Sequence, residues 1–188
     1  MDAHAGPTPM HLRKDAMLAA AAMVQEVNTI ALSHSPYGRG TVGSLRVEPN
    51  SRNVIPGYVQ CSVDFRHPEL EGLIDMEARL RRFAEQLAAQ NRVDIDIEKV
   101  TEFAPCKFSN SCLDAIRQSI KTFGLSSMPI VSGAGHDAVY VARQSPSAMI
   151  FIPCKDGISH NEIEDALPEH IEAGANVLLG AMVEMAQQ

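Results

Sequence analysis

The sequence predicts a mixed fold in two parts, a two-layer α+β sandwich over residues 1–104 and an α/β segment over residues 105–188. Two long stretches of the first part carry apolar residues at helical spacing, and the stretches beside them alternate apolar and polar residues as half-buried strands do. After Pro105, short apolar runs alternate with glycine-rich turns and helical stretches. The first order is typical of helices that cover one face of a sheet, and the second of α/β proteins.

Composition and charge indicate a folded protein and exclude some classes of partner. The chain has 188 residues, of which 45% are hydrophobic and 21% charged, enough for one ordinary domain or two small ones with a buried core. The formal charge of −7 and the absence of a Lys/Arg-rich run argue against nucleic acid and anionic membranes as partners. No apolar run approaches the roughly 20 residues that cross a bilayer, so no membrane partner is expected.

The N-terminus and the cysteines indicate the compartment. Residues 1–9 are polar and rich in Gly and Pro, without the basic start and apolar stretch of a secretory signal. The four cysteines are scattered and lack CxxC spacing, which predicts buried thiols and not a zinc site: Cys61, Cys106, Cys112 and Cys154. We therefore expect a reduced, cytoplasmic protein.

The elements of the first part follow from periodicity. The predicted order is a helix over 10–33, a strand over 41–47, a strand over 59–66, a helix over 69–90 and a strand over 93–97. The buried stripe of the first helix is expected to be Met17, Ala20, Ala21, Val24, Val27 and Ile30. Because no strand precedes this helix, the sheet is expected to lack one member.

The helices and strands of the second part are predicted from apolar runs and glycine-rich turns. Helices are expected over 110–123, 136–143 and 168–188, the first capped at Ser109 or Asn110. The apolar run 148–152 does not alternate, so we expect a strand buried on both faces. A shorter apolar run, 129–131, precedes a glycine-rich turn.

Polar residues in the first part could bind a ligand. His4 stands beside Gly and Pro in an entry loop, where a surface role is the usual one. Asn53 and Arg66 flank the polar face of one strand. An Arg guanidinium can bind a carboxylate with two parallel hydrogen bonds. The alternative, which spacing alone favours, is a solvated strand face with Arg66 paired to Asp64 or Glu69.

The second part offers a glycine-rich turn and a late histidine. The turn with Gly133 and Gly135 precedes a helix, so its N–H groups could hold an anion, although its spacing does not match a dinucleotide fingerprint. His160 follows a predicted strand and a glycine, where α/β proteins often place site residues, but one His is not a metal centre. Ser132 and Ser159 lack a nucleophile elbow, which disfavours a serine hydrolase.

Several motifs occur in a characteristic order along almost the whole chain. They are His4-Ala5-Gly6-Pro7-Thr8-Pro9-Met10, Thr41-Val42-Gly43, Asn53-Val54-Ile55-Pro56-Gly57, Asp64-Phe65-Arg66, Ser132-Gly133-Ala134-Gly135-His136-Asp137-Ala138 and Gly157-Ile158-Ser159-His160-Asn161. In this order they resemble the M20-type N-carbamoyl-L-amino acid hydrolases, allantoate amidohydrolases and β-ureidopropionases. The resemblance implies a lid domain that dimerises, over residues 1–104, and the C-terminal segment of an α/β metallohydrolase catalytic domain, over residues 105–188.

The resemblance also implies roles for individual residues. His4 would be the catalytic lid histidine, Asn53 and Arg66 would bind the carboxylate end of the substrate, and His160 would be a metal ligand. Gly135, or in the alternative Gly133, would contact the substrate through its backbone. The family uses two divalent ions (Mn, Zn, Co or Ni), which would polarise the carbonyl and supply hydroxide.

The resemblance departs from the family at the metal site. The first half of such enzymes carries a His, a bridging Asp, a Glu-Glu pair and a further His, and of the metal set only His160 is matched here. We therefore expect a homodimeric fragment of an amidohydrolase acting on carbamoyl or ureido C–N bonds, inactive alone and complemented by an N-terminal half. The alternatives are a fragment of an M20 aminoacylase or peptidase, and a non-catalytic dimerisation module.

Overall fold

The computed structural model describes residues 2–187 and divides the chain into two units, with the division between Pro105 and Cys106. We call residues 2–105 unit 1 and residues 106–187 unit 2, and we treat each by itself. The fold is mixed α/β, with helices and small sheets. This class agrees with the sequence prediction.

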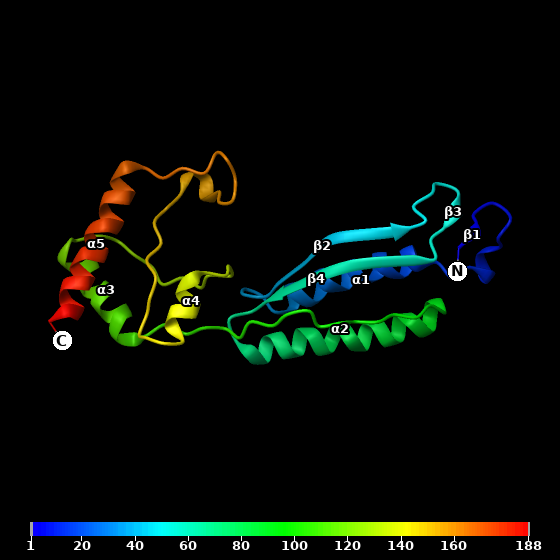
Figure 1. Ribbon diagram of the computed structural model, residues 1–188, viewed down its shortest axis with the longest axis horizontal. Helices are drawn as coiled ribbons and strands as arrows, with labels where there is room; N and C mark the ends of the chain where they lie inside the picture. The colour runs from blue at the N-terminus through cyan, green and yellow to red at the C-terminus, as the bar shows by residue number, and fades with distance from the viewer. Residues whose placement is uncertain (1, 188) are drawn as a thin grey trace. The chain divides into compact units, whose positions relative to one another are not determined.

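Unit 1 contains two antiparallel strand pairs and two long helices (Figure 1). Its elements are β1 (Ala3–His4), a 3-10 turn η1 (Met10–Leu12), α1 (Ala16–Ser33), β2 (Arg39–Glu48), β3 (Val54–Ile55), β4 (Tyr58–Arg66) and α2 (Leu70–Asn91). The long pair is β2 with β4, and the short pair is β1 with β3. Side-chain exposure alternates along β4 as the sequence predicted, with the polar side chains outward.

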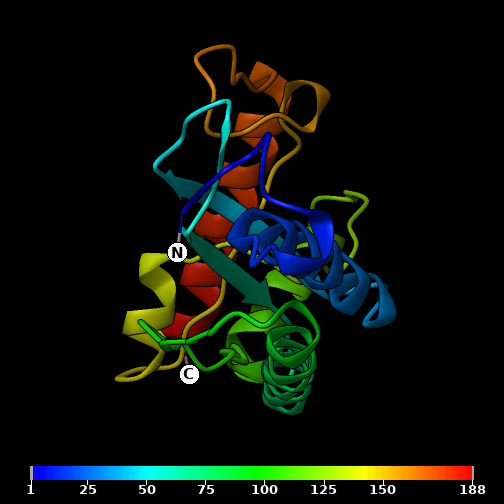
Figure 2. The same ribbon diagram turned by 90° about the vertical axis from the view of Figure 1, so that its right-hand side faces the viewer.

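The core of unit 1 lies between the two helices and one face of the long strand pair. Figures 1 and 2 show α1 and α2 side by side on the same side of β4. The side chains of Val27, Ile30 and Met76 are fully buried there. The predicted stripe of α1 is correct at Ala20, Val27 and Ile30 but wrong at Met17, Ala21 and Val24, all of which are exposed. Ala19, Met23 and Ala31 are buried in addition.

The start of α1 also differs from the prediction. The helix begins at Ala16, since the Asp15 carboxylate accepts the N–H groups of Met17 and Leu18 at 2.9 and 3.2 Å and so caps the first turn. By length and composition alone, α1 is apolar enough to cross a membrane, so the expectation that no segment meets this criterion was wrong. A helix packed in a protein core meets the same two criteria, and α1 contributes most of its buried residues to the core of unit 1.

The strand predicted at 93–97 is extended but joins no ladder among residues 2–187. Its exposure nevertheless alternates: Val93, Ile95 and Ile97 pack against the core, and Asp94 and Asp96 are exposed. The pattern was therefore right about the two faces of the segment and wrong about hydrogen-bonded pairing.

Unit 2 is built around a pair of packed helices. Its helical elements are α3 (Asn110–Thr122), α4 (Asp137–Ala142), the turn η2 (Lys155–Gly157) and α5 (Pro168–Ala186). The contact between α3 and α5 buries Ala115, Ser119, Val177 and Ala181, and the Ser119 hydroxyl donates to the Val177 carbonyl at 2.9 Å. The strand predicted at 148–152 is wrong: the segment joins no ladder in the described chain. Phe151 in this segment is 45% exposed.

Candidate functional site

The short pair of strands brings His4 and Asn53 together. His4 lies opposite Val54 in the β1–β3 ladder, and the N–H of Ala5 donates to the carbonyl of Asn53 at 2.8 Å. Both side chains are exposed. Two residues that are far apart in the sequence therefore stand next to each other at one end of unit 1.

The hydrogen bonds of the His4 ring define what it can do. Its Nδ1 accepts the N–H of Gly6 at 3.0 Å. A neutral ring with an acceptor at Nδ1 carries its proton on Nε2, so His4 presents an N–H donor on the other side of the ring. This is the chemistry needed by a group that binds a carbonyl oxygen.

Arg13 organises the loop that follows His4, a role that the sequence did not reveal. Its guanidinium donates to the carbonyl of Ala5 at 2.6 Å and to the carbonyl of Thr8 at 3.1 Å. The Thr8 hydroxyl in turn donates to the His4 carbonyl at 2.7 Å. The available signal was an arginine three residues after the motif His4–Met10.

Arg66 ends β4, and the structure shows it paired. Its guanidinium binds the Asp64 carboxylate through three contacts, the shortest at 2.7 Å, and this hydrogen bonding raises the pKa of Arg66. The pairing with Asp64 is one of the two pairings that spacing alone favoured, the other being with Glu69. Both side chains are about half exposed, so Arg66 can exchange Asp64 for another carboxylate.

Arg66 and the His4–Asn53 pair lie at opposite ends of unit 1. β4 begins at Tyr58, next to the β1–β3 pair, and Arg66 is its last residue (Figure 1). Eight steps of roughly 3.3 Å put the two ends of β4 about 26 Å apart. Within one copy, the predicted substrate-binding residues of this unit therefore do not form one small site.

In unit 2, the glycine-rich turn holds a Ser–His pair. The Ser132 hydroxyl and Nε2 of His136 are 2.8 Å apart, and the N–H of Ala134 donates to the same hydroxyl at 3.2 Å. The His136 ring meets Phe151 edge-on, with centroids 5.6 Å apart. The sequence showed that the two residues are close but did not predict this contact, which fixes the shape of the turn.

Neither Gly133 nor Gly135 is required by the packing of the described chain. A Cβ at either position would meet no atom within 4 Å, and neither glycine has a positive φ. A side chain at either glycine would therefore enter empty space in the described chain. The substrate contact expected of this turn remains a prediction.

His160 is exposed and lies in a loop. Its φ is 56°, in the left-handed region that non-glycine residues seldom adopt, and its N–H donates to the Glu164 carboxylate at 2.9 Å. Within residues 2–187, no group of three or more His, Cys, Asp or Glu side chains is placed to hold a metal ion. The residues present thus supply one available imidazole and do not by themselves fit a two-metal centre.

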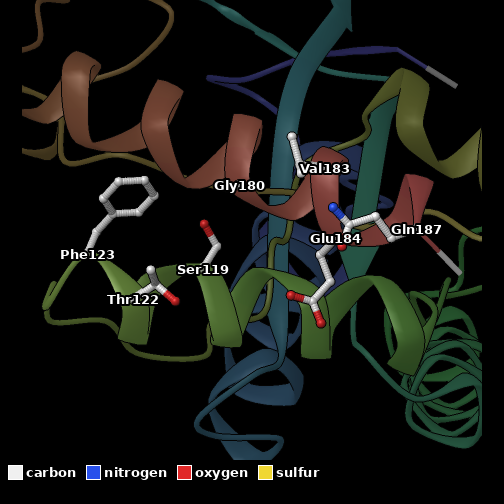
Figure 3. A pocket seen from close by; sticks show the side chains of 7 residues that line it. All are labelled: Ser119, Thr122, Phe123, Gly180, Val183, Glu184 and Gln187. Carbon is white, nitrogen blue, oxygen red and sulfur yellow. The ribbon is translucent and has the colours of Figure 1, made fainter.

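A hollow of about 210 Å³ lies between α3 and α5 (Figure 3). It is lined by Ser119, Thr122, Phe123, Gly180, Val183, Glu184 and Gln187. No predicted site residue is among them, and the Ser119 hydroxyl already donates a hydrogen bond to the Val177 carbonyl. We assign no function to this hollow.

The fold and the ordered motifs define a member of a hydrolase family. Residues 4–184 match the model of peptidase family M20/M25/M40, and the chain belongs to this family. Enzymes of this family are generally dinuclear metallohydrolases.

Named relatives and a solved structure show which members of the family this chain resembles. The chain is 41% identical to an N-carbamoyl-L-amino-acid amidohydrolase from Rhizobium meliloti, over 99% of its own length and 45% of that protein. It is 30% identical to an allantoate amidohydrolase from Bacillus subtilis, over 97% of its length and 44% of that protein. A crystal structure of an amidase of the hydantoinase/carbamoylase family from Burkholderia multivorans superimposes with a TM-score of 0.94 and 51% identity, covering 100% of this chain and 46% of that one. The chain thus spans less than half the length of these relatives.

Proposed function

We propose that this chain supplies the lid domain, residues 1–104, and the C-terminal catalytic segment, residues 105–188, of a binuclear amidohydrolase. The reaction would be hydrolysis of a carbamoyl or ureido C–N bond in an amino-acid-like substrate of the N-carbamoyl-L-amino acid or allantoate type. Family membership and the relatives named for these substrates support the proposal. The observation that carries it is the pairing of His4, with a free Nε2, beside Asn53 in the family's own motifs. A cytoplasmic location is proposed with it.

Each predicted residue has a definite task in this proposal. Arg66 leaves Asp64 and binds the substrate carboxylate with two parallel hydrogen bonds, which fixes the far end of the substrate. His4 donates from Nε2 to the carbonyl oxygen as negative charge develops there. Gly135, or in the alternative Gly133, would contact the substrate through its backbone.

The geometry of unit 1 favours a homodimer. An N-carbamoyl amino acid is about as long as two extended residues, roughly 7 Å, whereas the two ends of β4 are separated by about 26 Å. His4 and Arg66 of one copy cannot therefore hold the same substrate. We propose that Arg66 of one protomer shares a site with the partner subunit's His4, with dimerisation through the lid.

The metal ions require ligands beyond those that this chain places together. His160 would be one ligand, and no other described residue is grouped with it as a metal site would need. We propose that the remaining ligands lie outside residues 1–188, so the chain turns over substrate only when complemented.

The decisive experiment is an assay of the purified chain with Mn²⁺ or Zn²⁺ on N-carbamoyl amino acids and allantoate. We expect no turnover by the chain alone, and turnover after addition of the N-terminal part of the Burkholderia multivorans relative. In the complemented enzyme, His160→Ala should abolish activity and His4→Ala should lower kcat by about 10²–10³-fold. Turnover by the chain alone above its His160→Ala control would contradict the proposal. Preference for N-acyl amino acids or dipeptides would instead indicate an aminoacylase or peptidase.

Mixing two inactive variants tests the shared site. A 1:1 mixture of His4→Ala and Arg66→Ala chains forms heterodimers in which one of the two sites is intact, so about 25% of the wild-type activity should return. If both residues served the same site from one protomer, no activity would return. If the complemented enzyme behaved as a monomer in sedimentation, the homodimer would be wrong.

A further inference from the structure

The segment between His4 and α1 has little backbone hydrogen bonding of its own. We call residues 5–15 the His4 loop. It contains one short turn, η1, in which two N–H groups donate to carbonyls three residues earlier, at 3.0 and 3.3 Å. Pro7 and Pro9 have no backbone N–H to donate. The shape of the loop therefore depends on side chains that bind its carbonyl groups.

Arg92 binds this loop from the C-terminal end of α2. Its Nη2 donates to the carbonyl of His11 at 2.6 Å and to the carbonyl of Arg13 at 3.2 Å. α2 runs the length of unit 1 and ends at the same end of the unit as β1 (Figure 1). The guanidinium therefore joins segments that are 81 and 79 positions apart in the sequence.

The backbone conformation at Arg92 is one that seldom holds an arginine. Arg92 caps the C-terminus of α2 with a φ of 56°, in the left-handed region, and its N–H donates to the Ala88 carbonyl. Glycine is the common residue at such a helix end, because a Cβ is strained there. Arginine adds this strain but supplies a side chain that reaches the loop. The guanidinium, and not the backbone, is therefore what distinguishes this residue from a glycine cap.

A series of hydrogen bonds continues from Arg92 to the ring of His4. The Arg13 carbonyl accepts from Arg92, and the Arg13 guanidinium donates in turn to the carbonyls one and four residues after His4. The second of these belongs to Thr8, whose hydroxyl donates to the His4 carbonyl at 2.7 Å. The Gly6 N–H donates to Nδ1 of the His4 ring. The direction of Nε2 therefore depends on how firmly the loop is held.

The contact of Arg92 with the loop is directional and lies at the surface. A planar guanidinium directs its N–H groups in fixed directions, so the two carbonyls that accept from one nitrogen are held in a fixed arrangement. The Arg92 side chain is exposed, so its removal would leave no cavity in the core of unit 1. Its loss is therefore expected to loosen the loop and to leave the sandwich intact.

We propose that Arg92 is a positioning residue for His4. Held from α2, the loop keeps the Nε2 N–H of His4 in one direction before the substrate arrives, so little reorganisation is needed as charge develops on the carbonyl oxygen. In a loosely held loop, the same donor would be misdirected for part of the time. This role rests on the proposed function, in which His4 donates to the substrate carbonyl, and Arg92 itself would not touch the substrate.

Two substitutions at position 92 test the proposal in the complemented enzyme. Arg92→Gly removes the guanidinium, and glycine suits a positive φ, so α2 should keep its end. We expect it to lower kcat about tenfold and to change KM by no more than about twofold, because Arg66 still binds the substrate carboxylate. Arg92→Lys keeps a cation that can donate to two carbonyls, so it should recover most of the loss.

Arg82→Ala is the matched control. It removes the same charge from an exposed position on α2 and should leave kcat and KM unchanged. A measurement that does not depend on activity is hydrogen exchange of the chain by itself. Exchange in residues 5–15 should accelerate in Arg92→Gly and stay unchanged in Arg82→Ala.

A double-mutant comparison shows whether Arg92 acts through His4. In a His4→Ala enzyme, adding Arg92→Gly should cause no further loss of kcat. An undiminished further loss there, an unchanged kcat in Arg92→Gly alone, or unchanged exchange in residues 5–15 would overturn the role of Arg92 and leave the proposed reaction intact. Full activity of His4→Ala would instead contradict the donor role of His4, and the positioning role would fail with it.

Discussion

The two units differ in how completely each covers its own apolar surface. Unit 1 has a continuous core in which Ile30 and Met76 are fully buried between two helices and a strand pair. Unit 2 buries only a few residues where α3 meets α5 in the described chain, and leaves Met128 76% exposed and Leu179 62% exposed. Unit 1 thus forms a sandwich, whereas unit 2 forms mainly a helix pair.

The difference reflects how helices and strands satisfy their backbone hydrogen bonds. A helix satisfies its backbone hydrogen bonds internally, so α3 and α5 form although, within residues 2–187, neither has another helix or strand as a major neighbour. A strand needs hydrogen-bonded neighbours, so β2 and β4 form a ladder while the apolar run 148–152 remains without one in the described chain. We therefore expect that the apolar core stabilises unit 1 and that the contact between α3 and α5 stabilises unit 2.

The largest expected effect is in the core of unit 1. Met76→Ala removes a fully buried side chain, and such truncations cost about 2–5 kcal/mol because a cavity is left behind. Urea unfolding followed by circular dichroism would measure the loss, with Ile74→Ala, 57% exposed on the same helix, as the near-neutral control. Hydrogen exchange should accelerate in residues 2–105 only. Equal acceleration in unit 2 would contradict the distinction between the two units, because they would then unfold together.

Unit 2 should respond most to a change between its helices. A Cβ at Gly180 would overlap the hydroxyl of Ser119 and lie 3.2 Å from its Cβ, so Gly180→Ala forces α3 and α5 apart. Overpacking of this kind costs about 1–3 kcal/mol, which outweighs the better helix propensity of Ala. Combining it with Ser119→Ala should recover part of the loss, a coupling that a double-mutant cycle measures. If Gly180→Ala stabilises the protein, the helix contact is looser than described.

A smaller loss is expected at the start of α1. Asp15→Ala removes the carboxylate that accepts two N–H groups of the first turn, which costs about 1 kcal/mol. Thermal unfolding should report a fall in Tm of about 4–8 °C if unit 1 unfolds by itself. Lys14→Ala, at an exposed neighbouring position, is the control and should leave Tm unchanged. An equal effect of both changes would mean that the cap contributes nothing.

The sequence predicted helices well because their signals are local. The predicted helix over 69–90 is observed as Leu70–Asn91, and the one over 110–123 as Asn110–Thr122. The helix predicted from residue 10 begins instead at Ala16, since a side-chain cap and not periodicity sets its first turn. Pairing at 93–97 and 148–152 could not be predicted from the sequence pattern. Alternation at 93–97 reports which face is apolar, and the continuous apolar run 148–152 reports burial, but neither shows whether a neighbouring strand is present.

The candidate site was predictable as a set of residues and not as an arrangement. The motifs singled out His4 and Asn53, but their meeting depends on two strands of two residues each, too short to show any periodicity. Arg66 was placed correctly on the polar face of its strand, and its pairing with Asp64 was one of two pairings that the spacing left open. The contact between Ser132 and His136 depends on the folding of one turn, for which no signal beyond proximity in the sequence existed.

The smallest expected effect is electrostatic and lies where α2 holds residues 93–99. Glu77 accepts hydrogen bonds from Lys99 and Arg81, each at 2.9 Å, and these bonds lower its pKa. A carboxylate with a lowered pKa in the folded state stabilises the protein fully above the pKa of the unfolded chain, about 4.3. That contribution is lost as the pH falls through the folded pKa. The Glu77 side chain is 32% exposed, so screening limits the contribution to less than about 1 kcal/mol.

Glu77→Gln should therefore lower stability slightly at pH 7, and this loss should shrink as the pH falls through the lowered pKa of Glu77, as measured by urea unfolding over a pH series. Glu85→Gln, an exposed change on the same helix, is the matched control and should have no effect at any pH of the series. High salt should shrink the difference at pH 7 because exposed ion pairs are screened. A loss of the same size at every pH would show that Glu77 acts by packing and not by its charge.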